Sequence, residues 1–147
     1  MFRHILVPTD GSPASLRAAK SAVGFAKSLG ARVTGFFAAP PATPIVFGDF
    51  LPSGYLPPDE HAKVIDHMIA KHLGAVEKLA AEAGVPFEGV HTTSDFPADA
   101  ILEAAQQRKC DLICMAPHSR HGLAAMVLGS QTQKVLSQAK IPVLVFR

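Results

Sequence analysis

The sequence predicts an α/β protein with a single doubly wound parallel sheet and helices on both faces. Short apolar runs, typical of strands buried on both sides, alternate with segments whose apolar residues recur at helical spacing. Glycine and proline stand at most boundaries between these segments. Such alternation favours parallel strands joined by right-handed crossovers, and 147 residues fit one domain, residues 1–147.

The first strand and the first helix are predicted at the N-terminal end. The apolar run 4–7 ends at Pro8, and Ser12 and Pro13 suit the N-cap and the first turn of a helix. Gly30 then ends this helix as a C′ residue. Its apolar stripe is predicted to be Leu16, Ala19, Val23, Ala26 and Leu29.

A second strand at 31–38 is followed by a proline-rich segment and a long helix. Residues 39–58 are too apolar for a free linker, so we expect a loop packed over the body of the protein. The helix is predicted from about Pro58 to Ala83, where Gly84 ends it. Its apolar stripe is Ile65, Met68, His72, Val76, Leu79 and Ala83.

The second half of the chain continues the alternation. We predict a strand at Phe87 to Thr93, a helix from Pro97 to about Lys109, a strand at Asp111 to Met115, a helix from Ser130 and a strand at Ile141 to Phe146. Ligands of doubly wound sheets bind at the carboxyl ends of strands, where the winding reverses. Asp10 and Ala116 stand at two such ends, and they face one crevice if the first and fourth strands are neighbours.

Composition argues against several classes of partner. The net charge is +2 without a run of Lys or Arg, so no nucleic-acid surface is expected. No apolar run approaches the roughly 20 residues of a membrane span, and Met1 opens directly into a strand; we expect no membrane association and a cytoplasmic location. Cys110 and Cys114, spaced C-x-x-x-C, are interpreted as reduced and mostly buried.

Residues for catalysis or metal binding do not form a known pattern. Without a Ser/His/Asp order, paired carboxylates or a P-loop lysine motif, the sequence supports no enzyme of high turnover, and slow ATP hydrolysis is the most we expect. His61, His67 and His72 lack the i, i+4 spacing of helical metal sites. His118 and His121 lack nearby cysteine or carboxylate partners, so no metal site is predicted.

Five stretches, in order, resemble the universal stress protein family. They are Ile5 to Ser12, Pro97 to Ile101, Asp111 to Met115, Gly122-Leu123 with Leu128-Gly129-Ser130, and Ile141 to Val145. The resemblance covers the whole chain and is weakest at 39–58. It implies a Rossmann-like sheet of the adenine nucleotide alpha hydrolase type, in strand order 3-2-1-4-5, and a homodimer. It also implies one of two branches, of which one binds ATP and the other is not known for nucleotide binding.

The ATP-binding branch carries a signature of Gly, two residues, Gly, nine residues, then Gly-Ser or Gly-Thr. In this chain the signature falls on Ala116, Ser119, Gly129 and Ser130. The nine-residue spacer is therefore intact, while two of the three glycines are replaced. Pro117 also lacks the N–H that a phosphate would use.

The start of the last helix and the end of the first strand each have two interpretations. Ser130 and Gln133 form an S-x-x-Q capping box, which alone predicts only a well-capped helix, whereas the resemblance implies a phosphate site there. Asp10 matches an aspartate at the adenosine end of the family's site, or it bonds the turn that follows it. Ala38 matches a residue whose backbone meets the base.

These patterns predict weak binding of ATP or a related adenine nucleotide, with Mg²⁺ possible alongside it. The alternative is a stress protein that binds no nucleotide and acts as a protein-interaction dimer. The candidate cofactor-binding residues are Pro8, Thr9, Asp10, Ala38, Ala116, His118, Ser119, Arg120, Gly129, Ser130, Gln131 and Thr132.

Two segments are predicted to make protein contacts. Residues 141–146 are apolar and would form an edge strand in the order 3-2-1-4-5, so we expect them to pair with a second copy of the chain. Residues 39–58 leave the second strand at its carboxyl end. We expect this loop to fold over the mouth of the crevice and to offer a surface to other proteins.

Overall fold

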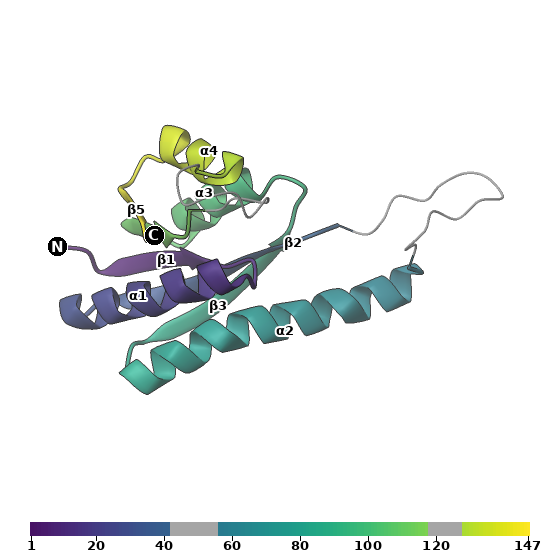
Figure 1. Ribbon diagram of the computed structural model, residues 1–147, viewed down its shortest axis with the longest axis horizontal. Helices are drawn as coiled ribbons and strands as arrows, with labels where there is room; N and C mark the ends of the chain where they lie inside the picture. The colour runs from purple at the N-terminus through teal and green to yellow at the C-terminus, as the bar shows by residue number, and fades with distance from the viewer. Residues whose placement is uncertain (42–55, 118–127) are drawn as a thin grey trace.

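The computed structural model describes residues 1–41, 56–117 and 128–147. These residues form a five-stranded, all-parallel sheet in the order β3-β2-β1-β4-β5 (Figure 1). The elements are β1 (His4–Pro8), α1 (Pro13–Leu29), β2 (Arg32–Ala39), α2 (Pro58–Ala83), β3 (Phe87–Thr93), α3 (Pro97–Gln107), β4 (Leu112–Met115), α4 (Ser130–Gln138) and β5 (Val143–Val145). The predicted fold class and strand order are confirmed.

Strand β1 lies at the centre of this sheet, and all five of its residues are buried. It pairs with β2 from His4 opposite Arg32 to Pro8 opposite Phe36. On its other side it pairs with β4, where Ile5 lies opposite Leu112. The chain moves outward from β1 through β2 to β3 and then restarts on the opposite side at β4. The winding therefore reverses between β1 and β4, which is where doubly wound sheets bind ligands.

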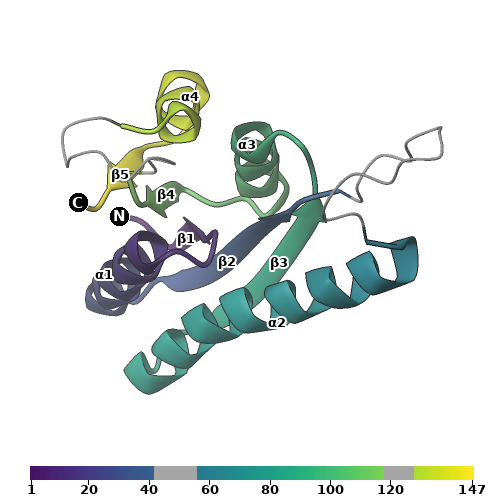
Figure 2. The same cartoon turned by 45° about the vertical axis from the view of Figure 1, so that its right-hand side comes forward.

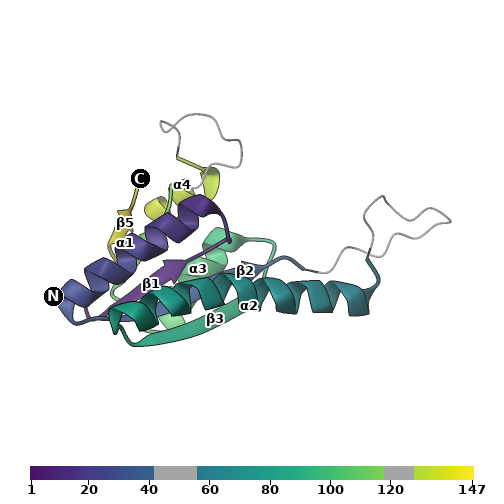
Figure 3. The ribbon, with the colours of Figure 1, turned by 60° about the horizontal axis from the view of Figure 1, so that its bottom comes forward.

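Helices cover both faces of the sheet. Figures 2 and 3 show α1 and α2 on one face and α3 and α4 on the other. Successive residues of β1 divide between the two layers, because side chains alternate along a strand. Ile5 packs in a cluster with residues of α1 and α2, such as Ala22 and Val76. Leu6 packs on the opposite face with Ile101 of α3 and Val135 of α4.

The long helix α2 extends beyond the carboxyl ends of the strands (Figure 1). The middle of the helix packs on the last residues of β2. Ile65, Met68 and Ile69 lie against a small buried cluster of Phe37, Ala39 and Leu73. Earlier residues of the helix are mostly exposed. In the described part of the chain, no helix is long and apolar enough to cross a membrane.

The predicted helix ends agree closely with the structure. Gly30 and Gly84 end α1 and α2 in the left-handed region, with φ of 66° and 71°. Helix α3 ends at Gln107, slightly before the predicted end, and Lys109 takes a left-handed φ of 54°. Its backbone N–H still bonds the carbonyl of Gln106 at 3.1 Å.

Two details of the predicted elements are wrong. Leu16 was expected in the buried stripe of α1, but it is 42% exposed, and Ser15 and Ala18 face the sheet instead. The buried face is made mainly of alanines, which allow the helix to approach the strands closely and turn the larger leucine outward. The last strand is also shorter than predicted, since it runs only over Val143–Val145, although the Pro142 carbonyl and the Phe146 N–H on either side still bond β4.

The carboxylate of Asp111 ties the start of β1 to the entry of β4. Its two oxygens accept hydrogen bonds from the backbone N–H groups of Arg3, at 2.8 Å, and His4, at 3.0 Å. The backbone N–H of Asp111 in turn donates to the carbonyl of His4 at 2.9 Å. This exchange sets the register of the two central strands where they begin.

We predict that Asp111→Ala lowers the free energy of unfolding by about 1–2 kcal/mol, because two backbone donors lose a charged acceptor. Urea denaturation followed by circular dichroism measures the change. Asp111→Asn keeps one acceptor oxygen and should lose less. Asp66→Ala removes an exposed carboxylate of α2 and should stay within about 0.5 kcal/mol of the parent. Equal losses for Asp111→Ala and Asp66→Ala would contradict this role.

Candidate functional site

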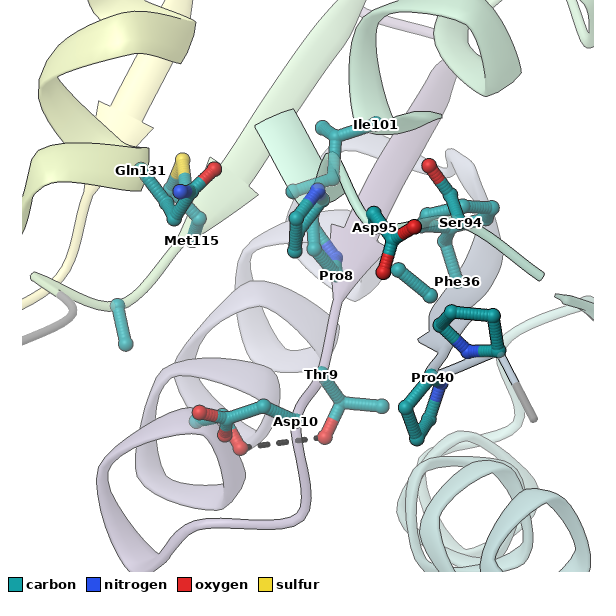
Figure 4. A pocket seen from close by; sticks show the side chains of 15 residues that line it. Pro8, Thr9, Asp10, Phe36, Pro40, Ser94, Asp95, Ile101, Met115 and Gln131 are labelled. Carbon is teal, nitrogen blue, oxygen red and sulfur yellow. Dashed lines mark hydrogen bonds between the residues drawn. The ribbon is translucent and has the colours of Figure 1, made fainter. Parts of the chain in front are cut away.

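A cavity of about 390 Å³ opens at the carboxyl ends of β1, β2 and β4, where the winding reverses. Figure 4 shows the side chains that line it, which come from strand ends and from the loops that follow them. The lining residues are Pro8, Thr9, Asp10, Ser15, Phe36, Ala38, Pro40, Pro41, Ser94, Asp95, Pro97, Ile101, Met115, Ala116 and Gln131. Most of these side chains are apolar, and the polar groups are hydroxyls, carboxylates and one amide.

Thr9 fixes the exit of β1 into the cavity. Its backbone N–H donates to the carbonyl of Phe36 at 2.8 Å, which extends the pairing with β2 by one residue. Its hydroxyl is buried against the Ser15 hydroxyl at 3.1 Å and accepts from the backbone N–H of Gly11 at 3.2 Å. These bonds hold the β1–α1 loop on the first turn of α1 (Figure 4).

Asp10 performs the structural role that was one of its two predicted interpretations. One carboxylate oxygen accepts from the backbone N–H of Ser12 at 2.9 Å, which closes the turn into α1. Ser12 then caps the helix, as predicted, because its hydroxyl accepts from the N–H of Ser15 at 3.1 Å. The Asp10 side chain nevertheless remains exposed and lines the cavity.

The start of α4 differs from the predicted capping box. The N-cap is Gly129 and not Ser130, which is the first helical residue, so no side chain of the N-cap bonds the first turn. The Gln133 amide reaches back to the Leu128 carbonyl at 2.9 Å and not to the N-cap N–H. The S-x-x-Q spacing does not show whether its serine is the N-cap or the first helical residue. Here the extended φ and ψ of Gly129, −61° and 152°, make Gly129 the N-cap and Ser130 the first residue of the helix.

Two side chains of α4 connect it to the rest of the site. The Thr132 hydroxyl is fully buried and donates to the carbonyl of Ala116 at 3.2 Å, which joins the end of β4 to the helix. The Gln131 side-chain oxygen accepts from the backbone N–H of Ala98 at 3.0 Å. Gln131 therefore caps α3 from a neighbouring helix, since the N-cap of α3, Phe96, has no side-chain acceptor.

The structure brings together half of the predicted cofactor-binding residues. Those that line the cavity are Pro8, Thr9, Asp10, Ala38, Ala116 and Gln131. Gly129, Ser130 and Thr132 lie at the start of α4 and do not line it. His118, Ser119 and Arg120 fall outside the described residues, as do 42–55 of the predicted lid.

Sequence reasoning missed the wall that follows β3. Ser94 and Asp95 line the cavity, and the backbone N–H of Ser94 donates to the carbonyl of Ala39 at 3.0 Å. This bond draws the β3–α3 turn over the end of β2. The signal was the position of both residues directly after a predicted strand in a parallel sheet, where ligand-binding loops occur.

His72 of α2 packs directly over the β1–α1 loop. Gly11 has a φ of +80°, and a Cβ built there would lie 2.0 Å from Cε1 of the His72 ring. The same ring contacts Phe37 edge to face, with centroids 5.2 Å apart. His72 faces the body of the protein, as its predicted place in the helix stripe requires. Its contact with the loop beside Asp10 was not foreseen.

Burial perturbs two histidines and both cysteines. The pKa of His72 is lowered mainly by burial, with Lys71 adding to the effect and Asp10 opposing it. Burial is also the first cause that lowers the pKa of His4, whose Nε2 lies 2.7 Å from the Thr34 hydroxyl. Burial raises the pKa of Cys110 to about 11 and that of Cys114 to about 12. Both thiols are free and buried, as predicted.

The described residues contain no group of three or more His, Cys, Asp or Glu side chains arranged to hold a metal ion.

Comparison with known proteins identifies the family. The model of the universal stress protein family matches residues 1–147. The chain belongs to the universal stress protein family. A universal stress protein of Methanocaldococcus jannaschii is 33% identical, over 100% of this chain and 83% of the relative. One from Thermus aquaticus is 35% identical, over 100% of both chains.

Solved structures of this family share the fold. A universal stress protein in complex with cAMP matches with a TM-score of 0.72 at 27% identity, over 99% of this chain and 97% of that one. The universal stress protein UspA of Lactobacillus plantarum matches with a TM-score of 0.73 at 22% identity, over 99% and 98%. The resemblance seen in five stretches of sequence is therefore confirmed over the whole chain.

We predict that Gly11→Ala destabilises this universal stress protein by more than the roughly 1–2 kcal/mol of a left-handed non-glycine residue, because its Cβ also meets the His72 ring. Chemical denaturation measures the loss. In a His72→Ala background Gly11→Ala should cost only the backbone strain, because the ring is absent. The losses of stability from Gly11→Ala and His72→Ala should therefore not add in the double variant. Gly24→Ala on α1, where a Cβ meets nothing within 4 Å, should be neutral or slightly stabilising.

We predict that stability falls as the pH drops below about 6.5, the ordinary pKa of histidine. His4 and His72 have lowered pKa values when folded, so the unfolded chain binds protons there first. The stability that their neutral forms provide is present above pH 6.5 and is lost as the pH falls through the folded pKa values. Each site adds a slope of up to about 1.4 kcal/mol per pH unit.

Urea midpoints between pH 7.5 and 5 measure this slope. His72→Gln should make the slope shallower, because the amide does not titrate. His91→Gln replaces an exposed histidine of β3 and should leave the slope unchanged. A His72→Gln variant that is as sensitive to pH as the parent would contradict the assignment.

Proposed function

We propose that this universal stress protein binds ATP or a related adenine nucleotide, weakly, in the cavity at the ends of β1, β2 and β4. The observation that carries the proposal is the convergence of Asp10, Ala38 and Ala116, from three strands, on one cavity at the reversal of winding. A relative that shares 27% identity and the same fold was solved with cAMP, an adenine nucleotide, which supports this class of ligand.

The phosphate groups are proposed to lie toward α4. The N-cap Gly129 has no side chain to bond the first turn, and the first intrahelical bond runs from the N–H of Gln133 to its carbonyl at 3.0 Å. The positive end of the helix dipole lies at this helix start and favours an anion there. The buried Thr132–Ala116 bond holds this helix start beside the end of β4.

Weak affinity follows from the composition of the β4–α4 loop. Pro117 has no N–H to donate to a phosphate, and each missing charge-assisted hydrogen bond costs about 1.5–3 kcal/mol. We expect a Kd of about 1 μM or higher. Mg²⁺ is proposed to enter with the phosphates, since its usual ligands in such sites are phosphate oxygens and water.

Isothermal titration of ligand-free protein with ATP, with and without Mg²⁺, tests the proposal. Gly129→Val should reduce the heat to background, because a branched side chain crowds the phosphate position. Its φ of −61° is allowed to valine, so the variant should still fold. The double change Pro117→Ser with Ser119→Gly should tighten binding by restoring a donor and a signature glycine.

Thermal unfolding of each variant serves as the control for folding. If neither the parent nor the Pro117→Ser, Ser119→Gly variant gives a binding heat with ATP, the nucleotide proposal is wrong. The alternative, a dimer that binds proteins and no nucleotide, would then be the better account of this family member.

We also propose a homodimer through β5, whether or not the protein binds a nucleotide. The backbone hydrogen bonds of this strand favour it. The N–H of Ile113 donates to the Pro142 carbonyl, and the N–H of Phe146 donates to the Met115 carbonyl, both at 3.0 Å. Even-numbered residues of this segment therefore face β4, and the backbone groups of Val143 and Val145 point away from the sheet. An edge with outward donors is suited to pairing with a second copy.

Val143→Pro removes one of the two outward donors of β5 and should shift the protein from dimer to monomer in light scattering. Val143→Thr keeps the donor and the strand shape, and it should remain dimeric. If the proline variant stays dimeric at the same concentration, the interface lies elsewhere. Residues 39–58 stay proposed as a surface for other proteins.

A further inference from the structure

The turn between β3 and α3 is held in place on both sides of Asp95. The N–H of Ser94 donates to the carbonyl of Ala39, and the N–H of Phe96 donates to the Ser94 hydroxyl, both at 3.0 Å. The carbonyl of Phe96 then accepts the first bond of α3, from Ala100 at 3.0 Å. Asp95 is therefore fixed at its backbone beside the end of β2, although it belongs to a loop.

The Asp95 side chain is exposed and lines the cavity, and none of the described residues bonds its carboxylate. In Figure 4 it is drawn on the side of the cavity where Phe36 and Pro40 lie, across the view from Gln131. Among residues 1–41, 56–117 and 128–147, none donates a hydrogen bond to it, and none of the described lining residues is Lys, Arg or His. The carboxylate therefore remains an open acceptor at this end of the cavity.

This end suits a flat aromatic ring and not a phosphate. Its walls include Phe36 and the proline rings of Pro8 and Pro40, which offer apolar faces. The Asp95 carboxylate carries negative charge at this end, so a phosphate is repelled toward the helix start of α4. A nucleotide is thereby oriented with its base beside Asp95.

We infer that Asp95 is a specificity-determining residue, whose carboxylate accepts hydrogen bonds from the amino-bearing edge of a purine base; this inference rests on the proposed nucleotide site. An ionised carboxylate can only accept hydrogen bonds, so it binds a base that offers N–H groups more tightly than one that offers none. Adenine offers its 6-amino group, and guanine offers N1–H with its 2-amino group. Unsubstituted purine offers no N–H on the ring edges, so it would lie against the carboxylate without giving it a hydrogen bond.

Competition between three triphosphates tests the inference, because they share one phosphate chain and one ribose. ATP, GTP and purine riboside 5′-triphosphate are titrated into the parent, Asp95→Ala and Asp66→Ala. In the parent, ATP or GTP should bind about tenfold tighter than purine riboside triphosphate. Asp95→Ala should bring the three affinities to within about twofold of one another, by weakening the amino-bearing nucleotides.

Asp66→Ala is the matched control, since it removes one exposed carboxylate from α2, outside the cavity, and it should keep the preference of the parent. Equal affinities in the parent, or a preference that persists in Asp95→Ala, would overturn the inference while the nucleotide site stands. Absence of binding by all three nucleotides would overturn both proposals. The better of ATP and GTP in the parent identifies which purine edge faces Asp95.

Discussion

The pairing of β1 with neighbours on both of its edges is the constraint on which the other parts depend. All five residues of β1 are buried, so every backbone group of this strand must find its partner in β2, β4 or the flanking loops. The carboxylate of Asp111 completes this pairing at one end, and the Thr9–Phe36 bond completes it at the other. The cavity opens at the carboxyl ends of β1 and β4, where the pairing of these two strands stops.

The walls of the cavity are held by bonds between elements that are distant in sequence. Gln131 of α4 satisfies a backbone donor at the start of α3, and Thr132 bonds the carbonyl that follows β4. Ser94 joins the β3–α3 turn to the end of β2. Polar side chains at this edge therefore stabilise the loops and line the cavity at once, as Asp10 does in the β1–α1 loop. A pocket framed in this way is pre-formed, which reduces the entropy that a ligand must offset.

The sequence was sufficient for the fold because strand and helix periods alternate cleanly and Gly30, Gly84 and several prolines mark the boundaries. It also predicted that Asp10 and Ala116, which follow two neighbouring strands, face one crevice, and both line the cavity. It failed for Leu16 because an alanine-rich helix face can rotate without losing burial. It did not single out Ser94 and Asp95, although both follow a predicted strand, because the bond from Ser94 to Ala39 that draws their turn over β2 joins residues far apart in sequence. Pattern reasoning sees spacing along one element, whereas such contacts arise only between elements.

The contact between His72 and Gly11 ties the position of α2 to that of the β1–α1 loop. The ring leaves no room for even a methyl group on the β1–α1 loop, so a shift of the helix toward the sheet must push this loop and the Asp10 carboxylate with it. Helix α2 also reaches past the carboxyl ends of the strands (Figure 1). The room available to the loop that carries Asp10 therefore depends on where the longest helix of the described chain lies.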